Sequence, residues 1–550
     1  MQKEKLKPKL FSVMKSYSKE QFVKDIIAGI IVAIIALPLS IALALASGVG
    51  PEQGIYTAII AGFLISLFGG SRVQIAGPTA AFATIVAGIV AKNGMDGLIV
   101  ATIIAGIILI AMGLLRLGSL IRFIPFTITT GFTAGIAVTI VIGQLKDFFG
   151  LTYLNGEKPI ETMEKIEAVA ANFGTFNWQA FVVGAVCLAI LIVWPKISQK
   201  IPGSLIAVFV GIAMVKFLNM NVNTIGDLYT ISSALPKFHF PKITGEIITS
   251  ELGDGFTIAI LAAIESLLSC VVADGMVGSK HRSNMELVAQ GIGNMGSALF
   301  GGIPATGAIA RTAANIKNGG RTPIAGMVHS VVLLVVLIAL MPYAALIPMP
   351  CIAAILFMVA YNMCGWRTFV NLCKTAPKSD ILVLVVTFLL TVIFDLVVAI
   401  EVGMIAAVVL FMKRVSDESE IKGWKYFDEE NDPDATALKV IPQFVRVYEI
   451  NGPLFFGMAD KIAEITLKDF TKVLIIRMRG VPALDATAMH SLEELHERCE
   501  KMGVQMVFSH VNEQPYKTMQ KSGFIRKIGK ENFRSHIDDA ISYASTLVNE

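Results

Sequence analysis

The chain has 550 residues, of which 54% are hydrophobic and only 16% are charged, and its mean hydropathy is +0.68. This composition excludes an ordinary soluble globular protein and indicates a polytopic membrane protein. The formal net charge of +4 is too small to indicate a nucleic-acid partner. Six cysteines show no disulfide or metal-site spacing, so we expect neither a metal nor a cofactor.

Residues 1–24 carry seven lysines among apolar side chains such as Phe11, Met14 and Tyr17. The segment has no apolar core of its own, so we expect no cleavable signal peptide. We predict a basic amphipathic lead on the cytoplasmic face of a membrane.

Fourteen apolar segments follow, and several are shorter than the roughly 20 residues of a full span. The predicted segments are 26–47, 54–69, 78–91, 97–114, 123–144, 179–195, 203–217, 256–273, 285–300, 306–317, 323–342, 349–363, 380–397 and 399–413. Together they predict a membrane part over residues 25–414.

Basic residues recur in the loops after even-numbered segments, for example Arg116, Lys280, Lys317 and Lys413. Loops after odd-numbered segments are neutral or acidic. The two long loops, at 145–178 and 219–255, therefore fall outside. The excess of Lys and Arg in cytoplasmic loops predicts that both termini are cytoplasmic.

Two of the segments are interrupted in the same way. Residues 67–70 (Leu-Phe-Gly-Gly) recur at 299–302, and each copy leads into an extended piece, a proline and a new helix start. Interrupted segments at corresponding places in two halves indicate a transporter's substrate site. Chance recurrence, or glycines that serve close helix packing, is the alternative.

The chemistry of these breaks favours an anion. Each half-helix N-terminus carries about half a positive charge, and Arg311 adds one more. We expect the second half-helix to start near Thr306, with Arg311 pointing into a cavity. The candidate substrate-binding residues are Thr79, Ala80, Thr306, Gly307, Ala308 and Arg311.

Glu265 lies well inside an apolar segment, and buried carboxylates in membranes mark ion or proton pathways. The alternative is a structural partner for Arg311. Ser269 lies one turn on, and either lines the ion site or bonds to its own helix backbone. His329 is favoured as a hydrogen-bonded packing residue over a proton relay. No nucleophile elbow, HExxH or Walker loop is present, so we predict that the chain is not an enzyme.

The composition becomes polar and acidic after Arg414, which predicts a linker over residues 415–436. Alternating strand and helix patterns then predict a small α/β domain at 437–550. The expected strands are 440–450, 473–478 and 504–509, and the expected helices are 486–502 and 514–522.

The layout resembles the SulP anion-transporter family, bacterial relatives of animal sulfate, chloride and bicarbonate exchangers. The resemblance rests on 25–29 with Leu37-Pro38, on 71–79, and on 301–311 continuing to 319–323. Residues 263–268, 274–281 and 286–287 resemble most closely the bacterial four-carbon dicarboxylate member.

This resemblance implies an inverted repeat of seven plus seven transmembrane segments, divided into a core domain and a gate domain. It places substrate between the third and tenth segments, and the coupling ion at Glu265 and Ser269. Many animal relatives have a glutamine where this chain has Leu39, so that substrate contact is absent here.

The C-terminal domain resembles a STAS domain. Phosphorylated relatives carry Asp-Ser-Ser-Gly where this chain has Asp485-Ala486-Thr487-Ala488, which argues against the usual phosphoswitch. The predicted function is secondary active transport of sulfate or a C4-dicarboxylate across the inner membrane, coupled to protons. A sodium-coupled bicarbonate transporter and an uncoupled anion channel or exchanger are the alternatives. The resemblance also implies a homodimer and leaves room for a cytosolic protein partner of the STAS domain.

Overall fold

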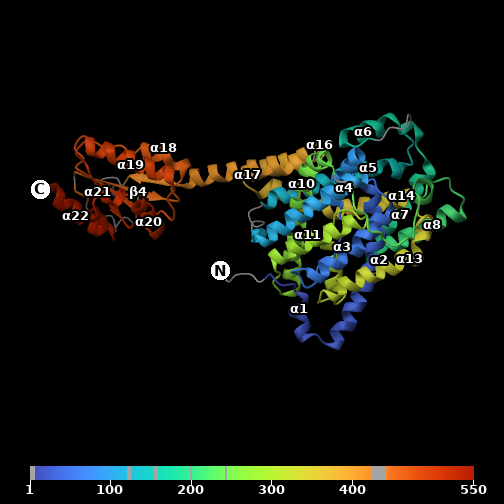
Figure 1. Cartoon of the computed structure of the whole chain (residues 1–550). Coiled ribbons are helices and arrows are strands. Elements are labelled where there is room, and N and C mark those ends of the chain that lie inside the picture. The colour runs from blue at the N-terminus through green and yellow to red at the C-terminus, as the bar shows by residue number, and fades with distance from the viewer. Residues whose placement is uncertain are drawn as a thin grey trace. The chain divides into compact units, whose positions relative to one another are not determined.

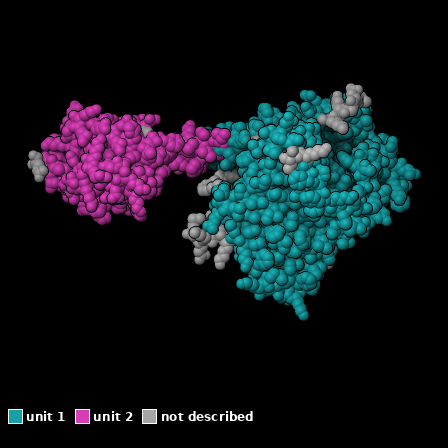
Figure 2. All heavy atoms as spheres, viewed as in Figure 1, with its two compact units in different colours: residues 1–404 teal, residues 405–550 magenta. Residues whose placement is uncertain are grey.

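The computed structural model describes residues 6–119, 125–153, 159–197, 201–241, 244–394, 396–423, 441–442 and 444–549. The chain divides into two compact units, residues 1–404 and 405–550, which are coloured separately in Figure 2. Each unit is described by itself.

The first unit is almost entirely helical (Figure 1). Its first half contains α1 (Leu10–Val13), η1 (Met14–Ser16), α2 (Lys19–Ala46), α3 (Pro51–Phe68), β1 (Ala76–Gly77), η2 (Ala80–Phe82), α4 (Ala83–Leu114), α5 (Phe126–Phe149), α6 (Thr162–Ala171), η5 (Phe173–Thr175), α7 (Trp178–Ile197), α8 (Gly203–Phe217) and α9 (Ile225–Leu228). Its second half contains α10 (Gly245–Val277), α11 (Ser283–Leu299), β2 (Thr306–Gly307), α12 (Ile309–Lys317), α13 (Ile324–Ala344), α14 (Met349–Cys364), α15 (Trp366–Thr375), α16 (Lys378–Ile393) and the start of α17 (Leu396–Glu418).

Every predicted apolar segment has a helix as its counterpart. The third and fourth segments share α4, whose backbone breaks at Gly94, where φ is 64° and ψ is −161°. Among the described residues, eight helices are long and apolar enough to cross a membrane: α2, α3, α4 with η2, α5, α7, α10, α13, and α14 continued by α15. The count of fourteen crossings stays a prediction.

One predicted boundary is wrong. Residues 246–254 were expected in an outside loop, but they form the first turns of α10, where Glu251 is buried and accepts a hydrogen bond from Asn93. Polar residues occupy these turns, so hydropathy alone begins the segment too late. The predicted lead at 1–24 overlaps α2, which begins at Lys19 with Ser18 as its N-cap.

The helices pack in two groups. In one group α11 packs on α3 and α4, α10 packs on α4, and α13 packs on α2 and α3. In the other, α14 packs on α5 and α7, and α16 packs on α5. The predicted division into two helical domains corresponds to these groups, and both interrupted segments belong to the first.

The second unit contains a five-stranded sheet in the order β3-β4-β5-β6-β7, in which β4 to β7 are parallel and β3 is antiparallel to β4. Its elements after α17 are β3 (Glu420–Gly423), β4 (Val445–Asn451), η7 (Phe456–Met458), α18 (Ala459–Ala463), β5 (Val473–Gly480), α19 (Ala486–Lys501), β6 (Gln505–Ser509), α20 (Glu513–Lys521), α21 (Phe524–Ile528), η8 (Lys530–Asn532), β7 (Phe533–Arg534) and α22 (Ile537–Asn549). Separate apolar clusters cover its two faces, and α22 contributes Ala540, Ile541 and Ala544 to one of them.

The predicted α/β pattern of this unit is confirmed, because each expected strand and helix is present. The start of the predicted linker is wrong. Residues 415–418 complete α17, and residues 420–423 form the edge strand β3. Residues 424–436 of the predicted linker, with its Asp432-Pro433-Asp434, lie outside the described residues. A four-residue polar strand becomes recognisable only when its partner β4 is known.

Candidate functional site

The two interrupted segments meet as a pair of short strands. Ala76 is paired with Gly307 and Gly77 with Thr306, and the Ala308 N–H donates to the Ile75 carbonyl at 2.9 Å. Both glycines leave room for a buried side chain beside the strands. A Cβ on Gly77 would collide with Arg311 Nη1, and a Cβ on Gly307 would collide with Gln74 Nε2.

A helix begins directly after each strand. The first starts at Ala80 in η2 and continues as α4, with Thr79 in extended conformation before it. The second, α12, starts at Ile309, so the expected start near Thr306 is wrong by three residues, because β2 pairing holds Thr306 and Gly307 extended. The first amide groups of a helix have no partner within it, and they favour negative charge.

Glu265 of α10 joins the two broken segments. Its Oε2 accepts hydrogen bonds from Thr79 Oγ1 at 3.0 Å and from Thr306 Oγ1 at 2.9 Å. The two hydroxyl oxygens lie 3.3 Å apart. Thr306 is buried, whereas Thr79, Glu265 and Ala308 remain partly accessible and Ala80 is buried. Three segments that are far apart in the sequence therefore place a carboxylate and two hydroxyls at one accessible point.

Arg311 lies differently from the expectation. Its side chain is only 3% exposed and packs against the backbone of the first broken segment. Nη2 donates to the Pro78 carbonyl at 3.1 Å, while Nη1 is buried without a hydrogen-bond partner in the structure. Among the described residues no ion pair joins Arg311 to Glu265, so the alternative role of Glu265 as its salt-bridge partner is not supported. Arg311 instead binds the backbone carbonyl of Pro78 from a buried position.

Two serines of α10 flank this arrangement. Ser266, which sequence reasoning missed, accepts a hydrogen bond from the Gly307 N–H at 3.1 Å. The predicted Ser269 is 1% exposed, and its hydroxyl has no partner in the described part of the chain, so the expected alternative of a bond to its own helix is absent there. His329 is fully buried, and neither ring nitrogen has a hydrogen-bond partner in that part.

A second buried carboxylate, Glu286 of α11, was also missed as a functional residue. Its Oε2 accepts from the Gly70 and Ser71 amides at 2.8 and 3.1 Å. Its Oε1 accepts from Gln74 Nε2 and Gln290 Nε2, both at 3.0 Å. Glu286 therefore holds the start of the first broken segment. A carboxylate inside an otherwise apolar segment was the available signal, but its donors could not be identified from sequence spacing.

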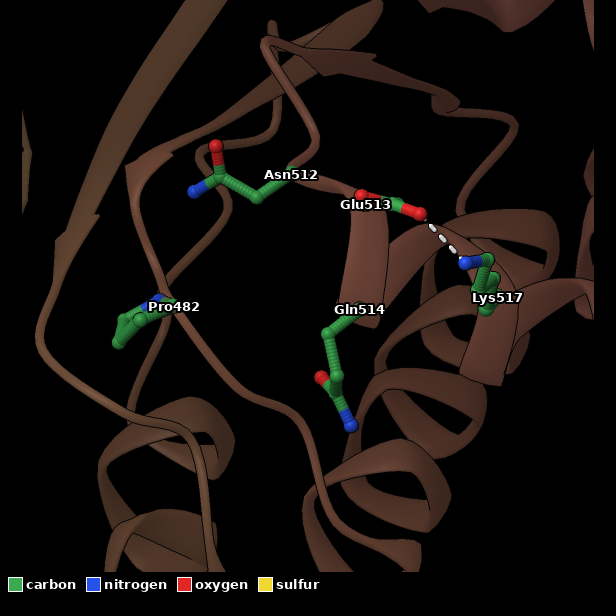
Figure 3. Close-up of a pocket in the computed structure, with 5 residues that line it drawn as sticks. All are labelled: Pro482, Asn512, Glu513, Gln514 and Lys517. Carbon is green, nitrogen blue, oxygen red and sulfur yellow. Dashed lines mark hydrogen bonds and ion pairs between the residues drawn. The ribbon is translucent and has the colours of Figure 1, made fainter. Parts of the chain in front are cut away.

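The polar side chains that line a hollow on the second unit already have hydrogen-bond or ion-pair partners. Figure 3 shows it, lined by Pro482, Asn512, Glu513, Gln514 and Lys517. Asn512 donates to the Arg479 and Val481 carbonyls, Gln514 bonds both backbone groups of Leu484, and Glu513 pairs with Lys517 at 2.5 Å. These side chains are occupied by structural contacts.

Comparison with protein families decides the assignment. A model described as the sulfate permease family matches residues 22–387. The chain belongs to this family. A STAS-domain model matches residues 435–540. The sulfate permease family consists of membrane transporters, so the prediction that the chain is not an enzyme is confirmed.

Several relatives match nearly the whole chain. The Bacillus subtilis protein named putative sulfate transporter YvdB is 41% identical over 530 residues, which cover 96% of this chain and 98% of the relative. The bicarbonate transporter BicA of Synechocystis is 30% identical over 511 residues, covering 90% and 89%. The family membership thus identifies the chain as an anion transporter and does not specify which anion it carries.

Solved structures agree with this fold. The transmembrane domain of a cyanobacterial bicarbonate transporter BicA matches with a TM-score of 0.62 at 30% identity, over 71% of this chain and 98% of that one. The murine anion transporter Slc26a9 matches with a TM-score of 0.88 over 98% and 94%. At 19% identity, the second likeness concerns the fold alone.

Proposed function

We propose that this member of the sulfate permease family is a secondary active transporter that takes up a small dianion together with a proton, and that Glu265 carries the proton. The observation that carries the proposal is the position of Glu265. Its Oε2 accepts hydrogen bonds from hydroxyls of both broken segments, and the residue is still partly accessible. Anion and proton therefore bind within one cluster of side chains.

Charge balance links the two ligands. Two helix N-termini and Arg311 supply roughly two positive charges. An ionised Glu265 reduces the sum to about one, which matches a dianion poorly. A protonated Glu265 restores the match, so binding of sulfate or a C4-dicarboxylate favours proton uptake, and release of the anion favours proton release.

The hydrogen-bond partners of Glu265 permit both protonation states. Each threonine hydroxyl is one donor and also an acceptor, and it can rotate. It can donate to a carboxylate and can accept from a protonated carboxyl group. The site therefore stays hydrogen-bonded as Glu265 gains or loses its proton. Both recorded hydrogen bonds go to Oε2, so a proton on that oxygen can be donated to either threonine oxygen.

Alternating access would move the group of helices around α3, α4, α10 and α11 against the group around α5, α7, α14 and α16. We also propose an inner-membrane location with cytoplasmic termini, a homodimer, and a role for the STAS domain in assembly or in binding a cytosolic protein. These proposals rest on the loop charges and on the family resemblance.

Sodium-coupled bicarbonate uptake is the second candidate. The Ser269 hydroxyl, which has no partner among the described residues and lies one turn from Glu265, favours it because sodium takes oxygen ligands. Two relatives are also named bicarbonate transporters. An uncoupled channel or exchanger is the third, and neither needs a carboxylate at the anion site.

Purified protein in proteoliposomes tests the proposal. Labelled sulfate, succinate and bicarbonate are offered while pH and sodium gradients are imposed separately. Proton-coupled uptake of a dianion predicts accumulation that rises as external pH falls at constant sodium. Accumulation that follows only the sodium gradient would establish the second candidate, and flux without accumulation would establish the third.

A further inference from the structure

The N-terminal segment, residues 6–24, is attached to the transport unit by hydrogen bonds. The Lys9 N–H donates to the Gly69 carbonyl at 2.8 Å, and Lys9 Nζ donates to the Lys280 carbonyl at 2.7 Å. Arg282, in the turn between α10 and α11, donates to the Lys7 carbonyl at 2.7 Å and to Ser12 Oγ at 2.9 Å. The segment is therefore fixed to the elements that carry Glu265 and Glu286.

Its apolar side chains nevertheless face outward. Phe11, Met14 and Phe22 are 52%, 48% and 45% exposed. An exposed apolar face also runs along α2, at helical spacing, through Val23, Ile27, Ile30 and Ile34. α2 is long and apolar enough to cross a membrane, so this face is available to lipid. Phe11 and Met14 precede this helix in the chain, and Phe22 lies in its first turn.

Cations surround this extension. Lys7, Lys15 and Lys19 are exposed. Lys9 Nζ bonds the Lys280 carbonyl and Arg282 bonds the Lys7 carbonyl, so these two cations lie close together. Burial and the nearby Arg282 and Arg72 lower the pKa of Lys9, while Asp274 raises it. Within the described residues, no carboxylate lies within ion-pair distance of Lys9, Arg72 or Arg282, and Arg72 Nε has no partner. This region has an excess of positive charge next to an exposed apolar surface.

We propose that residues 6–24 form a binding surface for the anionic lipid headgroups of the bilayer, with Phe11, Met14 and Phe22 inserted at the interface and the lysine and arginine side chains paired with lipid phosphates. Apolar side chains inserted at the membrane interface and basic side chains attracted to anionic lipids act together in binding a segment to the bilayer surface. Each Lys or Arg near an anionic surface strengthens binding about fivefold. The turn between α10 and α11 is thereby tied to the bilayer surface through Arg282.

Fluorescence of the full-length protein in bilayers locates the segment. Phe11→Trp adds a reporter, and the emission of the parent protein is subtracted. We expect quenching of the added emission by brominated lipid, with protection from aqueous acrylamide. Strong acrylamide quenching without lipid quenching would overturn the proposal. Met14→Trp provides a second reporter if the first variant melts at a lower temperature.

Lipid preference tests the charge. Brominated phosphatidylglycerol should quench the added emission of the Phe11→Trp variant more than brominated phosphatidylcholine at equal mole fraction. Adding Lys7→Gln, Lys15→Gln and Lys19→Gln to that variant should abolish the preference. A matched triple change in the second unit, at the exposed Lys501, Lys521 and Lys530, should preserve it. Equal quenching by both lipids without the lysine changes, or loss of the preference on adding soluble glycerol phosphate, would show that bilayer headgroups are not the ligand. Neither outcome depends on which anion is transported or how transport is coupled.

Discussion

Glu265 and Glu286 are both carboxylates inside the helical unit, and they differ in the groups that surround them. Glu286 receives four N–H donors, two from the backbone and two from glutamine side chains. Glu265 receives two hydroxyl groups. An N–H group donates only, whereas a hydroxyl both donates and accepts.

This difference separates a structural carboxylate from a titratable one. A proton on Glu286 Oε2 would face the Gly70 and Ser71 amides, which cannot accept it, so these two contacts favour the charged form and the residue holds the first broken segment in place. A proton on Glu265 finds oxygen acceptors within 3.0 Å. Burial alone therefore does not identify a coupling residue. A better indication is that its partners can change from hydrogen-bond donors to acceptors.

The largest expected effect is that of Glu286→Gln. The NH₂ group then faces either the two backbone N–H groups or the Gln74 and Gln290 amides, which must turn or lose their partner, and each buried donor left unpaired costs about 1–3 kcal/mol. We expect a clear fall in melting temperature and a loss of transport at every pH. A folded variant with the parental melting temperature would refute the structural role, and Gln290→Ala, which removes one donor, should be milder.

Next in size is the effect of Arg311→Ala on the site at Glu265. At an effective dielectric constant of about 20, a unit charge about 4–8 Å from a bound anion contributes about 2–4 kcal/mol. We therefore expect anion affinity to fall by at least roughly thirtyfold, measured by binding to protein that is folded and inserted. Arg311→Lys keeps the charge but not the fork geometry, and should lose less. Parental affinity in the alanine variant would contradict the charge balance.

Glu265→Gln should behave unlike Glu286→Gln. With the amide oxygen in the place of Oε2, it can accept from both threonine hydroxyls, so the melting temperature should stay close to that of the parent. The variant mimics the protonated state permanently, so anion binding and exchange persist while pH-driven accumulation is lost. The measurement is labelled sulfate and succinate accumulation from pH 5 to 8. Retained pH-driven accumulation would assign the proton to another residue.

The smallest effects concern the serines of α10. Ser266→Ala leaves the buried Gly307 N–H unpaired, at a cost of about 1–3 kcal/mol. Ser269→Ala loses no recorded hydrogen bond, so stability should change by less than about 0.5 kcal/mol. Proton-driven uptake should survive the second change. Impaired uptake that depends on sodium would instead support the sodium-coupled alternative.

Much of this arrangement follows from local sequence. A proline, glycines and an arginine inside apolar segments identify both breaks, because such residues disfavour a continuous span wherever they occur. Glu265 stands out for the same reason. The STAS strands and helices follow from short-range periodicity.

The direction of the Arg311 side chain and the hydrogen-bond donors of Glu286 depended on the tertiary structure. The Glu286 donors at Gly70 and Ser71 lie 216 and 215 residues away in sequence. Arg311 turns towards Pro78 because the two strands pair, and the same pairing delays the start of α12 to Ile309. Local propensity determines where a helix can break, but the groups that meet at the break are set by packing between segments that are distant in the chain.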